Sequence, residues 1–250
     1  IPVYGELPRK PRKLKNQEIV VNLEEPSELS ECFPLLAERM VALSDGNGGN
    51  PLSVLITSTC SGEGKTYLSV NLALSLAVAG KKVLLMDMDL RKGALSALLG
   101  GAGKPGLGDL EQAGEGGWRS LVEQSPVSDH LDYLFAGTVP DHPSRLLLHD
   151  RIRKLMEEVK EQYDFIFMDC VPYSSLADAR IVARLADVTL YVMRAGCVKK
   201  RDLAGLQKIW KNGELKRMGI VLCDVEPHGR SSRGYAVYRS LDTSSPCAGK

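Results

Sequence analysis

Short apolar runs alternate with longer segments of helical periodicity along most of this chain, and this alternation limits the possible folds more than any other feature. In residues 65–80 and 149–163, apolar side chains recur at helical spacing, and the first of these segments stops at Gly80. Six short runs are predicted as strands: 53–58, 83–87, 131–137, 164–169, 189–194 and 219–225. Strands that alternate with helices form βαβ units, so we expect an α/β fold with a parallel sheet and helices on both faces.

Length and composition predict a single domain with tails. The chain has 250 residues, 44% of them hydrophobic and 25% charged, which is ordinary for a globular protein. A net charge of +1 argues against nucleic acid as a main partner. The six cysteines include no C-x-x-C pair, which favours a reducing cytosol, and no stretch approaches the roughly 20 apolar residues that span a bilayer. We therefore expect a cytoplasmic domain without a nucleic-acid partner. Because the sequence starts with Ile1 and not with Met, we also expect it to be part of a longer protein.

Three segments of the chain differ in composition. Residues 1–27 contain four prolines and a cluster of five basic residues, which predicts a basic juxtamembrane-type linker; a solvated flexible arm fits this composition equally well. Residues 28–226 contain the predicted sheet and form one predicted domain. Residues 227–250 lack periodicity and are rich in Ser, Gly and Arg, so we expect a flexible tail that carries Tyr235 and Tyr238.

A phosphate-binding loop follows the first predicted strand. Residues 59–66, TCSGEGKT, match G-x-x-x-x-G-K-[ST] except that Thr59 replaces the first glycine. In such a loop the backbone N–H groups and a helix N-terminus bind phosphates, while the lysine neutralises the β and γ oxygens. The alternative, a glycine turn with an unrelated lysine, fits the strand-loop-helix context poorly. We assign ATP binding to Cys60, Ser61, Gly62, Glu63, Gly64, Lys65, Thr66 and Tyr67, and magnesium binding to the Thr66 hydroxyl.

Carboxylates follow two further predicted strands. Asp87 and Asp89 end one strand, and Asp169 ends a later one in the manner of a Walker B acid. We expect Thr66, Asp87 and Asp169 to bind Mg²⁺, and Asp87 or Asp89 to act as the base that phosphoryl transfer requires, beside the catalytic Lys65. Alternatively, Asp87 and Asp89 have only a structural role, as a helix N-cap and as a salt-bridge partner of Arg91.

With these motifs in place, the chain resembles the deviant P-loop proteins that include the MinD/ParA ATPases and the bacterial tyrosine kinases. The first group carries a signature lysine where this chain has Cys60, whereas Asp87-x-Asp89-x-Arg91 is similar to the Walker A′ motif of the kinases. Residues 1–8 are similar to the segment after the last transmembrane helix of fused members, and further agreement is found at 104–107, 136–147, 178–179 and 194–196.

The chain also departs from this family at several positions. Where the family has an E-x-x-R-x-x-R helix for ring contacts, this chain has Glu31, Pro34 and Ala37. Pro34 fits only the first turn of such a helix. An asparagine expected near the base is Cys223, and the tyrosine cluster of the tail is reduced to two residues.

The resemblance implies an ATP-dependent protein-tyrosine autokinase with Mg²⁺ as cofactor. It implies phosphorylation of Tyr235 and Tyr238 by a neighbouring copy, control of capsular or exopolysaccharide synthesis and export, and a place at the inner face of the cell membrane. The implied partners are other copies of the chain, a transmembrane activator or fused membrane domain, the polysaccharide export machinery and a tyrosine phosphatase. Two alternatives stay open: an ATP-binding interaction module of the polysaccharide machinery with weak or no kinase activity, and a membrane-positioning or DNA-partition ATPase.

Overall fold

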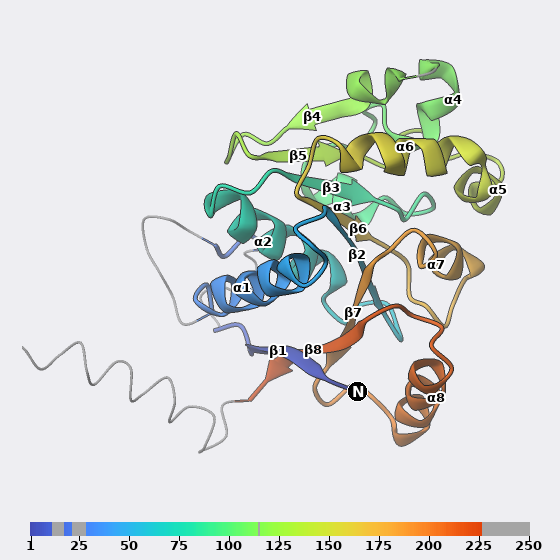
Figure 1. The fold of residues 1–250 in the computed structure, drawn as a ribbon. Coiled ribbons are helices and arrows are strands. Elements are labelled where there is room, and N and C mark those ends of the chain that lie inside the picture. Colours follow the sequence, from blue (N-terminus) through green and yellow to red (C-terminus); the bar gives the residue numbers. More distant parts are fainter. Residues whose placement is uncertain (12–17, 22–28, 115, 227–250) are drawn as a thin grey trace, which may run out of the picture.

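One large sheet organises the protein. The computed structural model describes residues 1–11, 18–21, 29–114 and 116–226, and its strands lie in the order β1-β8-β7-β2-β6-β3-β5-β4 (Figure 1). Neighbouring strands pair in parallel except β4 and β5, which are antiparallel. This confirms the predicted α/β fold. The strands are β1 (Val3–Pro8), β2 (Leu52–Ser58), β3 (Val83–Asp87), β4 (Val122–Gln124), β5 (Leu131–Leu134), β6 (Phe165–Asp169), β7 (Val188–Arg194) and β8 (Met218–Val225).

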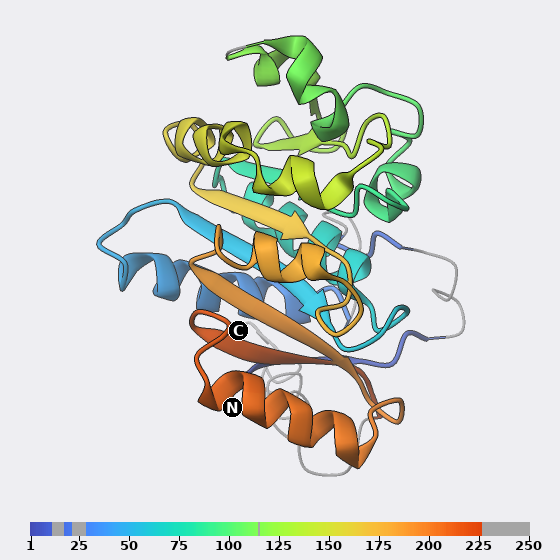
Figure 2. The ribbon, with the colours of Figure 1, turned by 90° about the vertical axis from the view of Figure 1, so that its right-hand side faces the viewer.

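Helices cover both faces of the sheet, as Figures 1 and 2 show. On one face α1 and α2 pack together, and their apolar side chains form one core with the strands. On the other face α5, α6, α7 and α8 cover a second core. The helices are α1 (Cys32–Asp45), α2 (Lys65–Val78), α3 (Ala94–Leu98), α4 (Leu110–Ala113), α5 (Pro143–Leu148), α6 (Asp150–Lys160), α7 (Ala177–Val182) and α8 (Lys200–Lys211), with 3₁₀ turns η2 (Leu107–Asp109) and η3 (Gly117–Leu121).

The central strands are largely apolar because both of their faces are buried. In β2, Val54 and Ile56 belong to the core under α1 and α2, whereas Leu55 between them belongs to the opposite core. Successive side chains of a strand point to opposite faces, so a central strand of this sheet buries side chains on both faces, and most of them are apolar. This arrangement explains the continuous apolar runs of the sequence.

Two strands were missed by the sequence prediction, which gave six instead of eight. Strand β4 is short and lies at one edge, antiparallel to β5. Strand β1 forms the other edge and pairs in parallel with β8, with Val3 opposite Ile220. The assignment of residues 3–8 to a linker is therefore corrected: this segment is part of the sheet.

Two further predictions concern the ends of the chain. Helix α1 begins at Cys32 with Pro34 in its first turn, the position expected for this proline. Tyr235 and Tyr238 lie outside the described residues. Within residues 1–11, 18–21, 29–114 and 116–226, no helix has the length and hydropathy required to cross a bilayer.

Candidate functional site

The phosphate-binding loop joins β2 to α2 at the carboxyl edge of the sheet. Gly62 and Gly64 have φ angles of 83° and 100°, a left-handed conformation that residues with a side chain rarely adopt. Gly64 is the N-cap of α2, so the unpaired N–H groups of the first helical turn face the loop. A helix N-terminus of this kind binds anions.

Lys65 folds back over the loop that precedes it. Its Nζ donates to Ser58 Oγ at 2.9 Å and to the Cys60 carbonyl at 3.4 Å. Burial lowers the pKa of the Lys65 ammonium, and the nearby carboxylates of Asp169, Glu63 and Asp89 only partly oppose this effect. A phosphate at this point would supply the compensating negative charge that the lysine lacks.

Asp169 at the end of β6 is held by two hydroxyl groups of α2. Thr66 Oγ1 donates to Asp169 Oδ2 at 2.7 Å, and Ser69 Oγ donates to Oδ1 at 2.9 Å. Burial, together with the charge of Asp87 on the neighbouring strand, raises the pKa of Asp169 to about 7, although these hydrogen bonds and Lys65 act against the rise. A divalent cation bound here would stabilise the ionised carboxylate.

The two carboxylates of the D-x-D motif occupy different environments. Asp87 is fully buried; its Oδ2 accepts hydrogen bonds from the N–H and the hydroxyl of Ser96 in α3, at 2.8 and 2.7 Å. Asp89 lines the pocket described below, and its Oδ1 accepts from the N–H groups of Arg91 and Lys92. Asp89 thus lines the pocket, while Asp87 fixes the start of α3 through Oδ2 and accepts the Asp89 N–H at Oδ1.

Arg91, which follows this motif, is held in place by a buried carboxylate. Its Nε donates to Asp178 Oδ2 at 2.8 Å, and Asp178 also accepts a hydrogen bond from Ser144. The Asp178 side chain is 3% exposed and the Arg91 side chain 41% exposed. The ion pair therefore fixes a guanidinium group at the rim of the pocket, where it can meet an anionic ligand.

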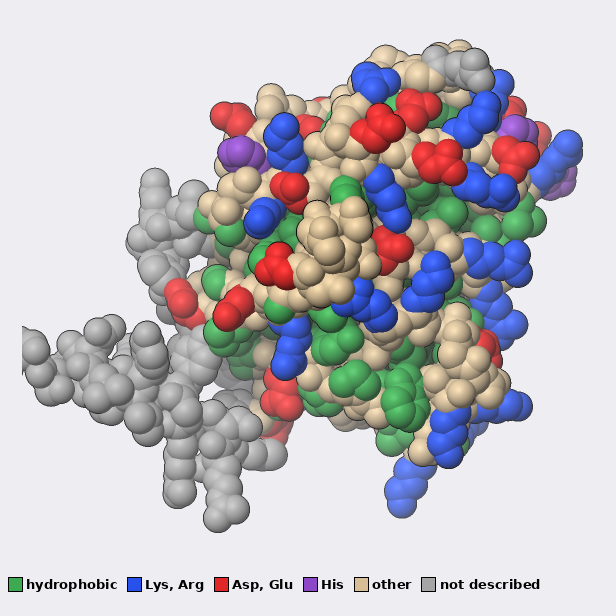
Figure 3. All heavy atoms as spheres, in the orientation of Figure 1, with side chains coloured by type: hydrophobic (Ala, Val, Ile, Leu, Met, Phe, Trp, Pro, Cys, Tyr) green, Lys and Arg blue, Asp and Glu red, His purple; other side chains and the backbone are tan. Residues whose placement is uncertain are grey.

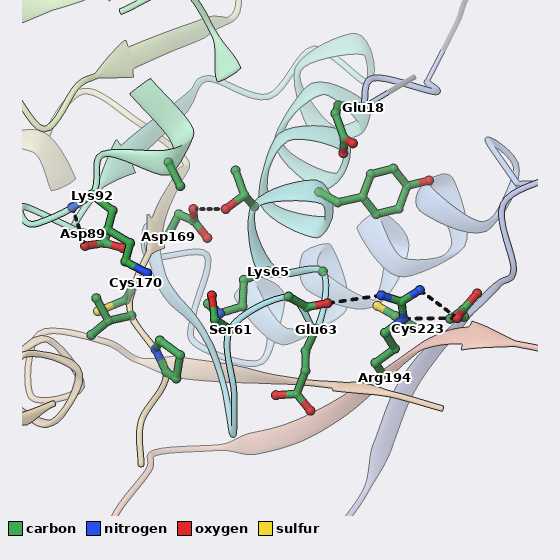
Figure 4. Close-up of a pocket in the computed structure, with 18 of the residues that line it drawn as sticks. Glu18, Ser61, Glu63, Lys65, Asp89, Lys92, Asp169, Cys170, Arg194 and Cys223 are labelled. Carbon is green, nitrogen blue, oxygen red and sulfur yellow. Dashed lines mark hydrogen bonds and ion pairs between the residues drawn. The ribbon is translucent and has the colours of Figure 1, made fainter. Parts of the chain in front are cut away.

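A pocket of about 1070 Å³ extends over the loop, and its walls come from segments far apart in sequence. Figure 4 shows Asp89 and Lys92 on one side of Lys65, with Arg194, Cys223 and Glu18 on the other. Of the residues predicted to bind ATP, all but Cys60 line this pocket, as does Asp169. Cys60 lies at the start of the loop, where its N–H donates to Glu63 Oε2 at 2.6 Å.

The wall opposite Asp89 was missed by the sequence analysis. Lys10 Nζ lies 3.9 Å from the centre of the Tyr67 ring, a cation–π contact inside the pocket. Arg9 and Arg194 both form ion pairs with Asp224 at 3.1 Å. The only sequence signal for this wall was the basic cluster of residues 1–27, which was assigned to a linker.

The oxygen donors near the loop suit Mg²⁺. Magnesium is bound in proteins by one or two carboxylates together with waters and phosphate oxygens, not by a complete cage of side chains. Thr66 Oγ1 and Asp169 supply such donors, and Asp87 lies opposite Asp169 on the neighbouring strand. In the part of the chain that the structure describes, no group of three or more His, Cys, Asp or Glu side chains could hold a metal by itself. These donors therefore fit a magnesium ion whose remaining ligands are phosphate oxygens and waters.

A glycine loop before a helix, a lysine over that loop and a hydroxyl-carboxylate pair beside it define a P-loop nucleotide-binding domain. The profile of the CobQ/CobB/MinD/ParA nucleotide binding domain (CbiA) matches residues 54–249. The chain is 31% identical over 231 residues to tyrosine-protein kinase YwqD of Bacillus subtilis, an alignment that covers 91% of this chain and 94% of YwqD. The chain therefore belongs to the bacterial tyrosine kinases within that nucleotide-binding family.

Two further comparisons agree. The chain is 35% identical over 209 residues to the putative tyrosine-protein kinase EpsB of Ralstonia nicotianae; this alignment covers 81% of the chain but only 27% of EpsB. It thus spans about a quarter of that longer relative. The BceF tyrosine kinase domain superposes with a TM-score of 0.76 at 28% identity, covering 90% of this chain and 94% of that domain.

Proposed function

We propose that this chain is an ATP-dependent protein-tyrosine autokinase that transfers the γ-phosphate of Mg-ATP to Tyr235 and Tyr238 of a neighbouring copy. One observation carries the proposal: a half-buried carboxylate, Asp89, lines the same pocket as Lys65 and Asp169. A nucleotide-binding protein that only binds needs the loop and the metal ligands. An additional carboxylate beside them supplies the base for an attacking hydroxyl.

The residues would divide the work as follows. The loop amides and Lys65 hold the β and γ phosphates, and Thr66 with Asp169 holds the magnesium ion, which neutralises phosphate charge. The tyrosine hydroxyl oxygen attacks the γ phosphorus, the bond to the ADP oxygen breaks, and the hydroxyl proton passes to Asp89. A tyrosine with an ordinary pKa near 10 needs such an acceptor at neutral pH. Asp87 holds Ser96 through Oδ2, and its Oδ1, which accepts the Asp89 N–H at 3.1 Å, would join the metal shell beside Asp169.

Membership of the bacterial tyrosine kinases supports a proposed setting. We propose self-association, a transmembrane activator or fused membrane domain, the polysaccharide export machinery, and a tyrosine phosphatase that reverses the reaction as partners. We place the protein at the inner face of the cell membrane, with control of capsular or exopolysaccharide export as its role.

Incubation of the purified chain with Mg-ATP, followed by intact mass measurement and phosphotyrosine mapping, tests the proposal. We expect phosphate on Tyr235 or Tyr238 in the parent chain and in a Lys82→Met control, which changes an exposed lysine outside the pocket. Lys65→Met should abolish it, and Asp89→Asn should lower the rate by on the order of 10²-fold while leaving ATP affinity within a few fold.

Other outcomes would point elsewhere. Phosphate that persists in Lys65→Met would exclude the loop as the catalytic centre. Tight ATP binding without any tyrosine phosphate, also in the presence of a membrane activator, would favour the interaction module. One observation favours this second candidate. Pro34, which is exposed, and Ala37, which is buried, stand where the family has the two arginines of its ring contacts.

A further inference from the structure

Helix α8 presents a basic surface on the side of the molecule away from the β4 edge. Its exposed residues include Lys200, Arg201, Lys208 and Lys211, with the exposed Lys199 at its N-cap. Figure 3 shows Lys and Arg side chains at the lower right, where α8 lies in Figure 1. Among the described residues, the only ion pair recorded for this group joins Arg201 to Asp202, its neighbour in sequence, at 3.6 Å. We call these five residues the α8 basic face. Apart from Arg201, their charges are not paired by other described residues.

Two large apolar side chains lie beside the α8 basic face. Leu203 is 48% exposed and Trp210 is 42% exposed. They are seven residues apart, which places them two turns apart on one side of the helix. Leu206, 2% exposed, lies between them in sequence and attaches the helix to the core. The exposed part of α8 is therefore amphipathic in its own right, with an apolar stripe next to lysines.

We propose that α8 docks on the surface of a lipid bilayer that contains anionic lipids. Lysines attract anionic headgroups, and a tryptophan with a leucine beside them can enter the headgroup region. A partner held only by charge, such as a nucleic acid, would leave Leu203 and Trp210 without a role. The combination of both features on one helix favours the bilayer.

This docking leaves the nucleotide pocket accessible. Among the described residues that line the pocket, none belongs to α8. The pocket lies at the carboxyl ends of the strands, whereas α8 covers one face of the sheet near β7 and β8. Ile1 packs against the same core as Leu206, so the start of β1 lies at this side of the molecule too. The proposal is independent of phosphoryl transfer and requires no ATP.

Vesicle sedimentation with the full chain tests the docking. We expect binding to phosphatidylcholine vesicles that contain phosphatidylglycerol, little binding to pure phosphatidylcholine, and weaker binding at raised ionic strength. Each lysine near an anionic surface contributes about fivefold to partitioning, so Lys200→Gln/Lys211→Gln should weaken it by about 25-fold. Arg153→Gln/Lys154→Gln on α6 removes the same charge elsewhere and should have little effect. Lys13→Gln/Lys15→Gln measures the separate contribution of the N-terminal basic cluster.

Tryptophan fluorescence provides a second measurement. The chain has two tryptophans, and Trp118 is 2% exposed, so Trp210 dominates any change in environment. A blue shift on addition of anionic vesicles, absent in Trp210→Phe, would place α8 in the interface. Equal vesicle binding by parent and α8 variants would overturn the proposal, as would no vesicle binding at all. Loss of self-association in the α8 variants without vesicles, or binding to DNA that anionic vesicles do not displace, would assign the surface to a second copy or to a nucleic acid instead.

Discussion

The two ends of the strands use carboxylates in opposite ways. At the carboxyl edge, Asp169 and Asp87 are buried on neighbouring strands, and burial raises the pKa of both. At the amino edge, Asp187 precedes β7 and accepts hydrogen bonds from Ser53 Oγ at 2.6 Å and from Lys160 Nζ at 2.8 Å. Its pKa is lowered, because these partners outweigh the effect of burial. Asp87 and Asp169 destabilise the protein when no ligand is bound, and their charge suits a cationic ligand. Asp187, in contrast, stabilises the fold through its hydrogen bonds.

Asp169→Asn should give the largest effect and should change activity and stability in opposite directions. Loss of the metal-binding carboxylate should reduce the rate of phosphate transfer on the order of 10²-fold or more. Removal of a buried charge beside Asp87 should at the same time raise the stability of the nucleotide-free protein, by about 1 kcal/mol. Phosphotyrosine formation and urea unfolding measure the two effects. A variant that is both inactive and less stable would show that Asp169 is needed for the fold, and the comparison would fail.

Asp187→Asn should show the reverse behaviour. The side chain loses charge-assisted hydrogen bonds to Ser53 and Lys160, so we expect the free energy of unfolding to fall by about 1–2 kcal/mol. Nucleotide affinity should stay within a few fold, because Asp187 does not line the pocket. Urea unfolding and titration with a fluorescent nucleotide test this pair of results. A large loss of affinity would mean that the amino edge also determines the geometry of the loop.

The pH dependence of the Asp187 effect sharpens the comparison. Because the pKa of Asp187 is lower in the folded than in the unfolded chain, its contribution is complete above about pH 5 and is lost as pH falls through the folded value. The difference in stability between parent and Asp187→Asn should therefore shrink from pH 7 to pH 3. A difference that stays constant over this range would assign the effect to packing and not to charge.

Lys160→Met should give the smallest effect. The Lys160 side chain is 34% exposed and the Asp187 side chain 28% exposed, so solvent weakens the ion pair. We expect a loss of about 0.5 kcal/mol, measured against Asp187→Asn in a double-mutant cycle. If Lys160→Met matched the effect of Asp187→Asn, the ion pair and not the Ser53 hydrogen bonds would carry the stability of this edge.

Sequence alone predicted the features that depend on neighbouring residues. The phosphate loop, the helix after it and the apolar central strands all follow from local spacing. It also predicted that Thr66 and Asp169 would act together, and a 2.7 Å hydrogen bond joins them, because the order of strands brings the ends of β2 and β6 together.

The features that sequence did not predict depend on distant contacts. The sequence of β1 has no clear alternation of apolar and polar residues. It forms a strand because it pairs with β8. Arg9 and Lys10 line the pocket for the same reason. The different roles of Asp87 and Asp89 depend on Ser96, which reaches Asp87 only after α3 has folded against the sheet. None of these contacts leaves a local pattern in the sequence.

The pairing of β1 with β8 has a consequence for the order of folding. Val3 and Ile220 are far apart along the chain, and β1 can join the sheet only after β8 has formed its own ladder with β7. Contacts of such long sequence separation form late, since closing a long loop costs entropy before any contact repays it. We therefore expect Leu7, Pro8, Arg9 and Lys10 to enter the pocket wall late in folding. The loop depends on the pairing of β2 with β6 and β7, which is shorter in sequence, so we expect phosphate binding to be possible before this wall is complete.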